Sequence, residues 1–172
     1  ENKKKLIVKE GSRYRVADDT LNPIDFRNAD ASAHFDLILP FGIHELCFLY
    51  PKNIMIVFGS KDAGKTALML NIIHDNMNKH ETIYWSSEMG GSELQKRLLN
   101  KDGIELKDWN FKAFERSYDF DDVIVPNGLN LIDFLELGGD EMEYYKCVAF
   151  IRKIYDKLGP DGVAIISLQK NK

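Results

Sequence analysis

Long apolar runs are missing from this chain of 172 residues. A membrane-spanning helix needs roughly 18 or more consecutive apolar residues, and no stretch comes close to that length. The first residues, ENKKKLIVKE, also lack the apolar core of a secretory signal peptide. The sequence therefore predicts a cytoplasmic location and no membrane partner.

Cysteine is scarce as well, and positive charge is outnumbered by negative charge. Cys47 and Cys147 lie far apart in the sequence, without a CxxC pair or the Cys/His spacing of a metal site, so we expect two reduced, partly buried thiols. The net charge of −4 excludes a surface that binds nucleic acid over its whole extent, so any contact with DNA or RNA must be local. Length and composition fit one globular core with a small extra segment.

The segment 53–66, NIMIVFGSKDAGKT, carries the most specific motif. Its apolar run predicts a buried strand, and the following residues fit every fixed position of the phosphate-binding pattern G-x-x-x-x-G-K-[ST]. Backbone amides of such a loop and the N-terminus of the next helix surround phosphate groups, while Lys65 reaches the β- and γ-phosphates and Thr66 binds Mg²⁺. The motif predicts a nucleoside triphosphate site made by Gly59, Ser60, Lys61, Asp62, Ala63, Gly64, Lys65, Thr66 and Ala67.

Segments typical of helices and strands alternate after this loop. An apolar helix is predicted to about Lys79, and further strands are predicted at 82–85, 111–114, 129–135 and 162–168. Two more helices are predicted, at 92–99 with Ser92 as N-cap, and from a capping box of Asp140 and Glu143 to Gly159 and Pro160. Residues 119–126 are predicted to be an acidic loop with little structure. The alternation predicts an α/β fold, with a mostly parallel sheet and helices on both faces.

Residues 1–38 differ in pattern from the rest. Segments 6–9 and 13–16 flank Gly11 and predict a short β-hairpin, followed by a linker over 18–38. We favour a plain two-stranded edge for this hairpin over the alternative, the wing of a preceding DNA-binding domain. The predicted domains are therefore residues 1–38 and an ATPase-like core at 39–172. Because the chain starts at Glu1 and stops just after a strand, we expect a piece of a longer polypeptide whose core is incomplete at its C-terminal end.

Polar residues near the ends of the other strands complete the predicted site, because ligands of such sheets bind at the carboxyl ends of the strands. Asp133 near the end of the third apolar strand is expected to order Mg²⁺. Phe134 stands where many ATPases have a Glu, so the base that activates water must come from another position. We favour Glu88, after the second strand, over Glu136. Gln169, after the last strand, is suited to detect the γ-phosphate by hydrogen bonding, although it also fits a polar strand cap.

The chain resembles the RecA-like motor ATPases, and among them the hexameric replicative DNA helicases of the DnaB type. The resemblance spans about residues 39–172 and rests on AGKTALMLNI, SSEM, LNLIDFLEL and AIISLQKN. It implies a RecA-like P-loop fold that hydrolyses ATP with Mg²⁺, in which Lys65, Glu88 and Gln169 act in catalysis and Thr66 and Asp133 hold the metal. It also implies a homo-oligomeric ring, a hexamer, and single-stranded DNA as partner.

Several functions stay open at this point. A DNA-replication motor is the interpretation we favour. A recombination mediator or clock-type regulatory ATPase would have the same core without unwinding a forked duplex. A nucleotide-gated DNA-binding or loading module would bind ATP with little turnover. A small-molecule kinase is disfavoured, since the sequence has no lid signature and no second substrate pocket.

Overall fold

The computed structural model describes residues 7–17, 21, 23–137 and 141–170. The chain divides into two compact units, Glu1–Ser32 and Ala33–Lys172, and each is described by itself. In the first unit, strands β1 (Ile7–Glu10) and β2 (Arg13–Val16) pair in antiparallel fashion. Gly11 has φ of 62° at the turn, a conformation that glycine adopts without strain. The predicted hairpin is confirmed.

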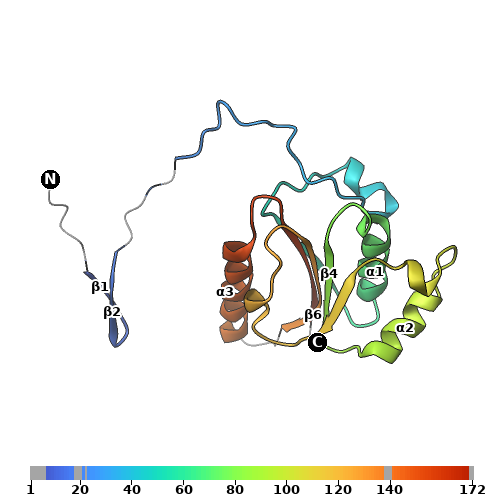
Figure 1. Ribbon diagram of the computed structural model, residues 1–172. Coiled ribbons are helices and arrows are strands. Elements are labelled where there is room, and N and C mark those ends of the chain that lie inside the picture. Colours follow the sequence, from blue (N-terminus) through green and yellow to red (C-terminus); the bar gives the residue numbers. More distant parts are fainter. Residues whose placement is uncertain (1–6, 18–20, 22, 138–140, 171–172) are drawn as a thin grey trace. The chain divides into compact units, whose positions relative to one another are not determined.

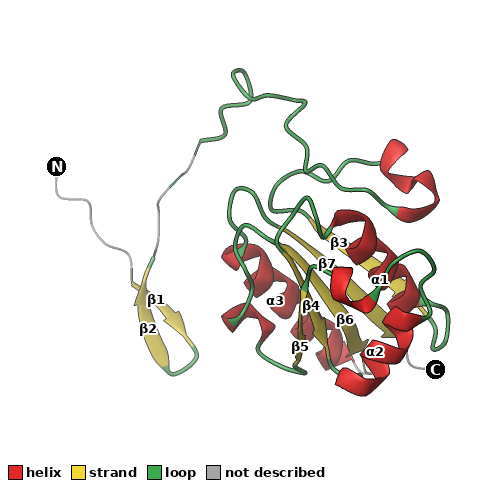
Figure 2. Cartoon of the chain, turned by 45° about the vertical axis from the view of Figure 1, so that its right-hand side comes forward, coloured by secondary structure: helices red, strands yellow, loops and turns green. Residues whose placement is uncertain are grey.

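The second unit contains a parallel sheet of five strands (Figure 1 and Figure 2). The strands lie in the order β3-β7-β6-β4-β5, and every neighbouring pair is parallel. Their bounds are β3 Ile54–Gly59, β4 Thr82–Ser86, β5 Lys112–Glu115, β6 Leu129–Leu137 and β7 Val163–Lys170. The predicted α/β fold with a parallel sheet is confirmed. One strand, β7, lies between the strand of the phosphate-binding motif and the strand that carries Asp133.

Helices cover both faces of this sheet (Figure 1). Helices α1 (Lys65–Asn76) and α2 (Gly91–Leu99) pack with one cluster of buried side chains, and α3 (Glu141–Lys157) packs with another. Neighbouring residues of β7 belong to different clusters, Ile165 to the first and Ile166 to the second. This alternation follows from the period of two in a strand, and it explains why β7 is apolar throughout its buried part. The described part of this unit also has three short 3₁₀ helices: Pro40–Glu45, Leu106–Asp108 and Phe120–Asp122.

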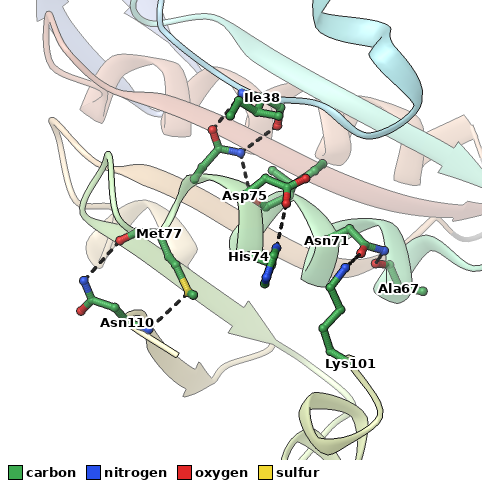
Figure 3. Close-up of polar contacts among 10 residues, drawn as sticks. Ile38, Ala67, Asn71, His74, Asp75, Met77, Lys101 and Asn110 are labelled. Atoms are coloured by element: carbon green, nitrogen blue, oxygen red, sulfur yellow. Dashed lines mark hydrogen bonds and ion pairs between the residues drawn. The ribbon is translucent and has the colours of Figure 1, made fainter. Parts of the chain in front are cut away.

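The segment before the first 3₁₀ helix belongs to the core rather than to a linker. Phe35, Leu37 and Leu39 are buried at alternate positions, and Phe35 N donates to Leu49 O at 2.7 Å. The fully buried Asn76 side chain accepts from Ile38 N at 2.8 Å and donates to Ile38 O at 2.7 Å (Figure 3). These contacts explain why the second unit begins at Ala33, a few residues before the boundary predicted from the sequence.

Other local predictions were wrong. Ser92 is not the N-cap of α2, because the helix already begins at Gly91 and its N-cap is Gly90. Cys47 is exposed, although Cys147 is buried as a free thiol. The acidic segment 119–126 is not merely a loop, since Phe120 and Ile124 are buried in the cluster under α3. The predicted capping box uses Asp140, which lies outside the described residues.

Candidate functional site

The carboxyl ends of four parallel strands meet at one edge of the sheet. Gln169 of β7 pairs with Gly59 at the end of β3 on one side and with Glu136 of β6 on the other. On the next pair of strands, Asp133 of β6 is opposite Ser86 at the end of β4. The register of the sheet therefore brings segments that are far apart in the sequence to one edge.

The phosphate-binding motif forms a tight loop between β3 and α1. Asp62 has φ of 59° and Gly64 has φ of 85°, so the backbone takes the left-handed conformation twice before the helix begins at Lys65. Lys65 Nζ donates to Gly59 O at 3.2 Å and to Ser60 O at 2.8 Å. The ammonium group thus lies across the start of its own loop. The first amides of α1 have no acceptor within the helix, which gives this end of α1 its capacity to bind an anion.

A cavity of about 670 Å³ opens over this loop. It is lined by ten of the residues predicted for the site: Lys61, Asp62, Ala63, Gly64, Lys65, Thr66, Ala67, Glu88, Asp133 and Gln169. Gly59 and Ser60 are not part of the lining, and their carbonyl groups instead accept the bonds of Lys65. Four further residues complete the wall: Ser86, Met89, Glu93 and Arg97.

Asp133 is held firmly at the floor of the cavity. It is only 4% exposed, Tyr84 Oη donates to its Oδ2 at 2.7 Å, and Ser167 Oγ donates to its Oδ1 at 2.8 Å. Burial and the neighbouring Asp133 carboxylate raise the pKa of Tyr84 far above its ordinary value, so the phenol stays protonated and remains a donor. Strand β6 continues beyond this residue to Leu137, so Asp133 lies within the strand rather than at its end.

Glu88 lies two residues past the end of β4 and is exposed at the cavity wall. A hydrogen bond holds the turn that contains Glu88, because Met89 N donates to Oγ of the buried Ser86 at 2.9 Å. The competing candidate, Glu136, belongs to β6, and its side chain lies outside what the structure describes. The choice between the two carboxylates as general base therefore stays a prediction.

None of the four further wall residues was predicted as a site residue from the sequence, and two of them, Glu93 and Arg97, form an ion pair. Arg97 of α2 is paired with Glu93, with Nε and Nη2 at 3.2 Å and 2.8 Å from Glu93 Oε1. A Glu and an Arg four residues apart on a helix are usually a solvated ion pair, so the spacing gave no signal of a site. Only the approach of α2 to the phosphate-binding loop turns this pair toward the cavity.

The oxygen groups at the cavity fit a magnesium ion. Among the described residues, no group of three or more His, Cys, Asp or Glu side chains is arranged to hold a metal by itself. Mg²⁺ does not need such a group, since it keeps several waters and binds through one or two carboxylates together with the phosphates of its substrate. The Thr66 hydroxyl and the Asp133 carboxylate, which line the same cavity, are a donor set of this kind.

Within the described residues, every helix is too short or too polar to cross a membrane. No protein-family model matches the chain, and a search of curated proteins finds no match either.

Proposed function

We propose that residues 39–172 form a RecA-like P-loop core that binds ATP with Mg²⁺ and hydrolyses it. The observation that carries the proposal is that one cavity brings the loop Lys61–Ala67 together with Glu88 just after β4, Asp133 of β6 and Gln169 of β7. Three of these groups each match one requirement of phosphoryl transfer to water: Lys65 of the loop neutralises charge, Asp133 binds the metal, and Glu88 orients the attacking water.

Binding of the phosphate chain is supported by the loop geometry. The ammonium of Lys65 now donates to two neutral carbonyl oxygens, those of Gly59 and Ser60. Phosphate oxygens are stronger acceptors because they are charged, so a bound triphosphate draws the ammonium away from the carbonyls. The positively polarised N-terminus of α1 adds to this attraction.

The metal and the water have separate partners in the cavity. Thr66 and Asp133 would hold Mg²⁺, which offsets the negative charge that develops on the phosphates. Asp133 can serve in this way because two hydroxyl donors already fix the direction of its carboxylate. Glu88 orients and deprotonates the water, and the neutral amide of Gln169 hydrogen-bonds the γ-phosphate without adding charge.

The finer assignment is a motor of the DnaB type that acts on single-stranded DNA as a hexameric ring in DNA replication. It is supported by the four sequence segments that resemble those helicases. A recombination or clock-type ATPase and a nucleotide-gated loading module with little turnover are the competing assignments.

The first experiment measures ATP binding and hydrolysis by the full-length chain, with and without single-stranded DNA, and the oligomeric state by light scattering. Lys65→Ala is expected to reduce turnover to background. Lys107→Ala is the matched control, because Lys107 is an exposed lysine that pairs with the exposed Glu105 and does not line the cavity. Hydrolysis by Lys65→Ala at the wild-type rate would refute the proposed site.

The same measurements separate the competing assignments. A replicative motor hydrolyses ATP faster with single-stranded DNA and unwinds a forked duplex. A recombination or clock-type ATPase hydrolyses ATP but leaves the fork intact. Tight ATP binding with negligible turnover, even in the oligomer with DNA present, identifies the loading module.

A further inference from the structure

The hairpin of β1 and β2 has no role in the proposed function. Among the described strands it is the edge of no larger sheet, because β1 and β2 pair only with each other (Figure 2). A hairpin of two strands is at best marginally stable in water by itself, and it gains stability when another surface covers one of its faces. The exposed side chains of the hairpin therefore indicate which kind of partner it fits.

Positive charge is concentrated at this end of the sequence. Residues 1–17 contain six Lys and Arg residues and two Glu, which makes this segment basic. Residues 18–172 have the opposite balance, with 17 Lys and Arg residues against 25 Asp and Glu. A basic segment attached to an acidic body is typical of a chain that binds a polyanion locally. The composition allows a contact with nucleic acid only if it is local, and this segment is suited to provide one.

The described side chains near the tip of the hairpin are exposed hydrogen-bond donors. Lys9 and Tyr14 are opposite each other in the strand register, and both are exposed. Ser12 and Arg13 follow the turn at Gly11 and are exposed as well. An ammonium, a guanidinium and two hydroxyl groups are among the donors that contact phosphate oxygens in protein–DNA complexes. Since all four side chains lie within residues 9–14, one phosphate backbone can contact several of them at once.

The shape of the hairpin favours a duplex over a single strand. Neighbouring strands lie about 4.8 Å apart, so a ribbon of two strands with its side chains fits into the major groove of DNA, which is about 12 Å wide. Proteins that bind single strands without sequence preference instead present several aromatic rings on which successive bases stack. The described hairpin residues include one aromatic side chain, that of Tyr14.

We propose that this hairpin binds duplex DNA, with Lys9 and Arg13 on phosphates and with Ser12 and Tyr14 as further hydrogen-bond donors. The inference goes beyond the proposed function, because it gives the first unit a ligand of its own and requires neither ATP nor Mg²⁺. Phosphate contacts carry no sequence information, so this binding does not depend on the base sequence. If the core acts on a single strand, one chain contacts both forms of DNA that meet at a fork.

The test measures binding of the full chain by fluorescence anisotropy, without ATP or Mg²⁺ and over a range of KCl concentrations. The probes are a labelled duplex of about 20 base pairs and a single strand of the same length. Lys9→Ala and Arg13→Ala each remove one positive charge from the hairpin. Gly11→Val keeps every charge but strains the turn, because a β-branched residue at φ of 62° is unfavourable.

The matched control is the double variant Lys107→Ala/Arg152→Ala. Both residues are exposed, lie outside the hairpin and form ion pairs, with Glu105 and Asp156 respectively. The control therefore lowers the net charge of the chain by the same amount as Lys9→Ala/Arg13→Ala.

We expect each single hairpin variant, Lys9→Ala or Arg13→Ala, to lower the slope of log K against log [KCl] by about 0.9 in magnitude. At about 0.1 M KCl each should weaken duplex binding about five- to tenfold, and the double variant roughly 50-fold, because each lost phosphate contact no longer releases a counterion. Gly11→Val should weaken duplex binding as well, since it disrupts the ribbon. The control should stay within about twofold of wild type.

Three results would overturn the proposal. If the control weakens duplex binding as much as Lys9→Ala/Arg13→Ala, binding follows net charge rather than the hairpin. If Gly11→Val binds the duplex like wild type, a basic segment suffices and the ribbon has no part in binding. If the hairpin variants weaken binding of the single strand as much as binding of the duplex, the ligand is not specifically a duplex.

The competing partner is another protein surface, because Ile7 and Val16 are exposed and opposite each other in the register. If Lys9→Ala/Arg13→Ala binds the duplex like wild type while Ile7→Ser/Val16→Ser lowers the mass measured by light scattering, the hairpin is an assembly contact and the proposal is wrong. Lys65→Ala should bind the duplex like wild type whether or not its ATPase activity is lost. Failure of the nucleotide site and failure of this inference are therefore measured separately.

Discussion

Tyr84 Oη donates a hydrogen bond of 2.7 Å to Oδ2 of Asp133 across two neighbouring strands, β4 and β6. Both side chains are buried beneath the cavity. Ser167 of β7 approaches the other oxygen of the same carboxylate from the opposite side. Asp133 is thus clamped between two strands, and its orientation does not depend on a bound metal.

The first prediction concerns this clamp. Tyr84→Phe leaves Asp133 Oδ2 without its phenol donor in a buried position, so the free energy of unfolding should fall by about 1–3 kcal/mol. The ATPase rate should fall as well, with a higher Mg²⁺ concentration needed for half-maximal rate, because the carboxylate loses its fixed direction. Urea unfolding and a Mg²⁺ titration of activity measure the two effects. Tyr118→Phe is the control, since Tyr118 is 71% exposed and is expected to change stability by less than about 0.5 kcal/mol.

The second prediction is the pH dependence of stability that Tyr84 causes. Burial, followed by the charge of Asp133, raises the pKa of folded Tyr84 above the ordinary value of 10.0. The contribution of protonated Tyr84 to the free energy of unfolding is therefore fully present below about pH 10. It decreases as the pH rises further, because the tyrosine of the unfolded chain ionises there and the folded one does not. Urea unfolding between pH 8 and about pH 11 should show a steeper loss for wild type than for Tyr84→Phe. If the free energy of unfolding fell equally steeply with pH in the two proteins, the pKa of folded Tyr84 would not be raised.

Much of the fold and of the candidate site could be predicted from local sequence patterns. The phosphate-binding loop could be recognised because its chemistry lies in one continuous segment, and Glu88 and Gln169 could be placed because parallel strands end at one edge. The partners of Asp133 could not be predicted. Tyr84 and Ser167 contact it only because β6 lies between β4 and β7, and this strand order is not contained in any single segment. Arg97 was missed for the same reason, since it lines the cavity only because of the way α2 packs.

The third prediction separates the two candidate bases. Glu88→Gln keeps the size of the side chain but removes its ability to take a proton, so ATP binding should persist while the hydrolysis rate falls by about 100-fold or more. Glu136→Gln is the matched variant, and it should retain most of the activity. Single-turnover hydrolysis and calorimetric ATP binding measure the two quantities. The reverse pattern would assign the base to Glu136.

The fourth prediction concerns the attachment of the segment before the first 3₁₀ helix. Asn76→Leu fills a similar volume, but it removes both hydrogen bonds to the backbone of the half-buried Ile38 and leaves that N–H and carbonyl without these partners. The free energy of unfolding should fall by about 2–4 kcal/mol. Hydrogen exchange should show faster exchange of the Ile38 amide relative to amides of β7. Asn78→Leu, at an exposed position after α1, is the control and should unfold like wild type.

The last prediction tests the close packing at the amino ends of the strands. A Cβ added to Gly162 would overlap the carbonyl oxygen of Pro126, which is backbone and cannot rotate away. Gly162 is also tied to the start of β3, because Lys52 N donates to Gly162 O at 2.7 Å. Gly162→Ala should therefore lower the free energy of unfolding by at least about 3 kcal/mol, the upper end of the usual cost of overpacking.

Gly91→Ala is the matched control for Gly162→Ala. Gly91 is exposed, opens α2, and has open space where the new methyl group would lie. Alanine favours a helix over glycine, so this variant should keep or raise the free energy of unfolding by up to about 1 kcal/mol. Urea unfolding of both variants measures the contrast. Equal stability of Gly162→Ala and Gly91→Ala would mean that Gly162 and Pro126 lie farther apart than in the structure.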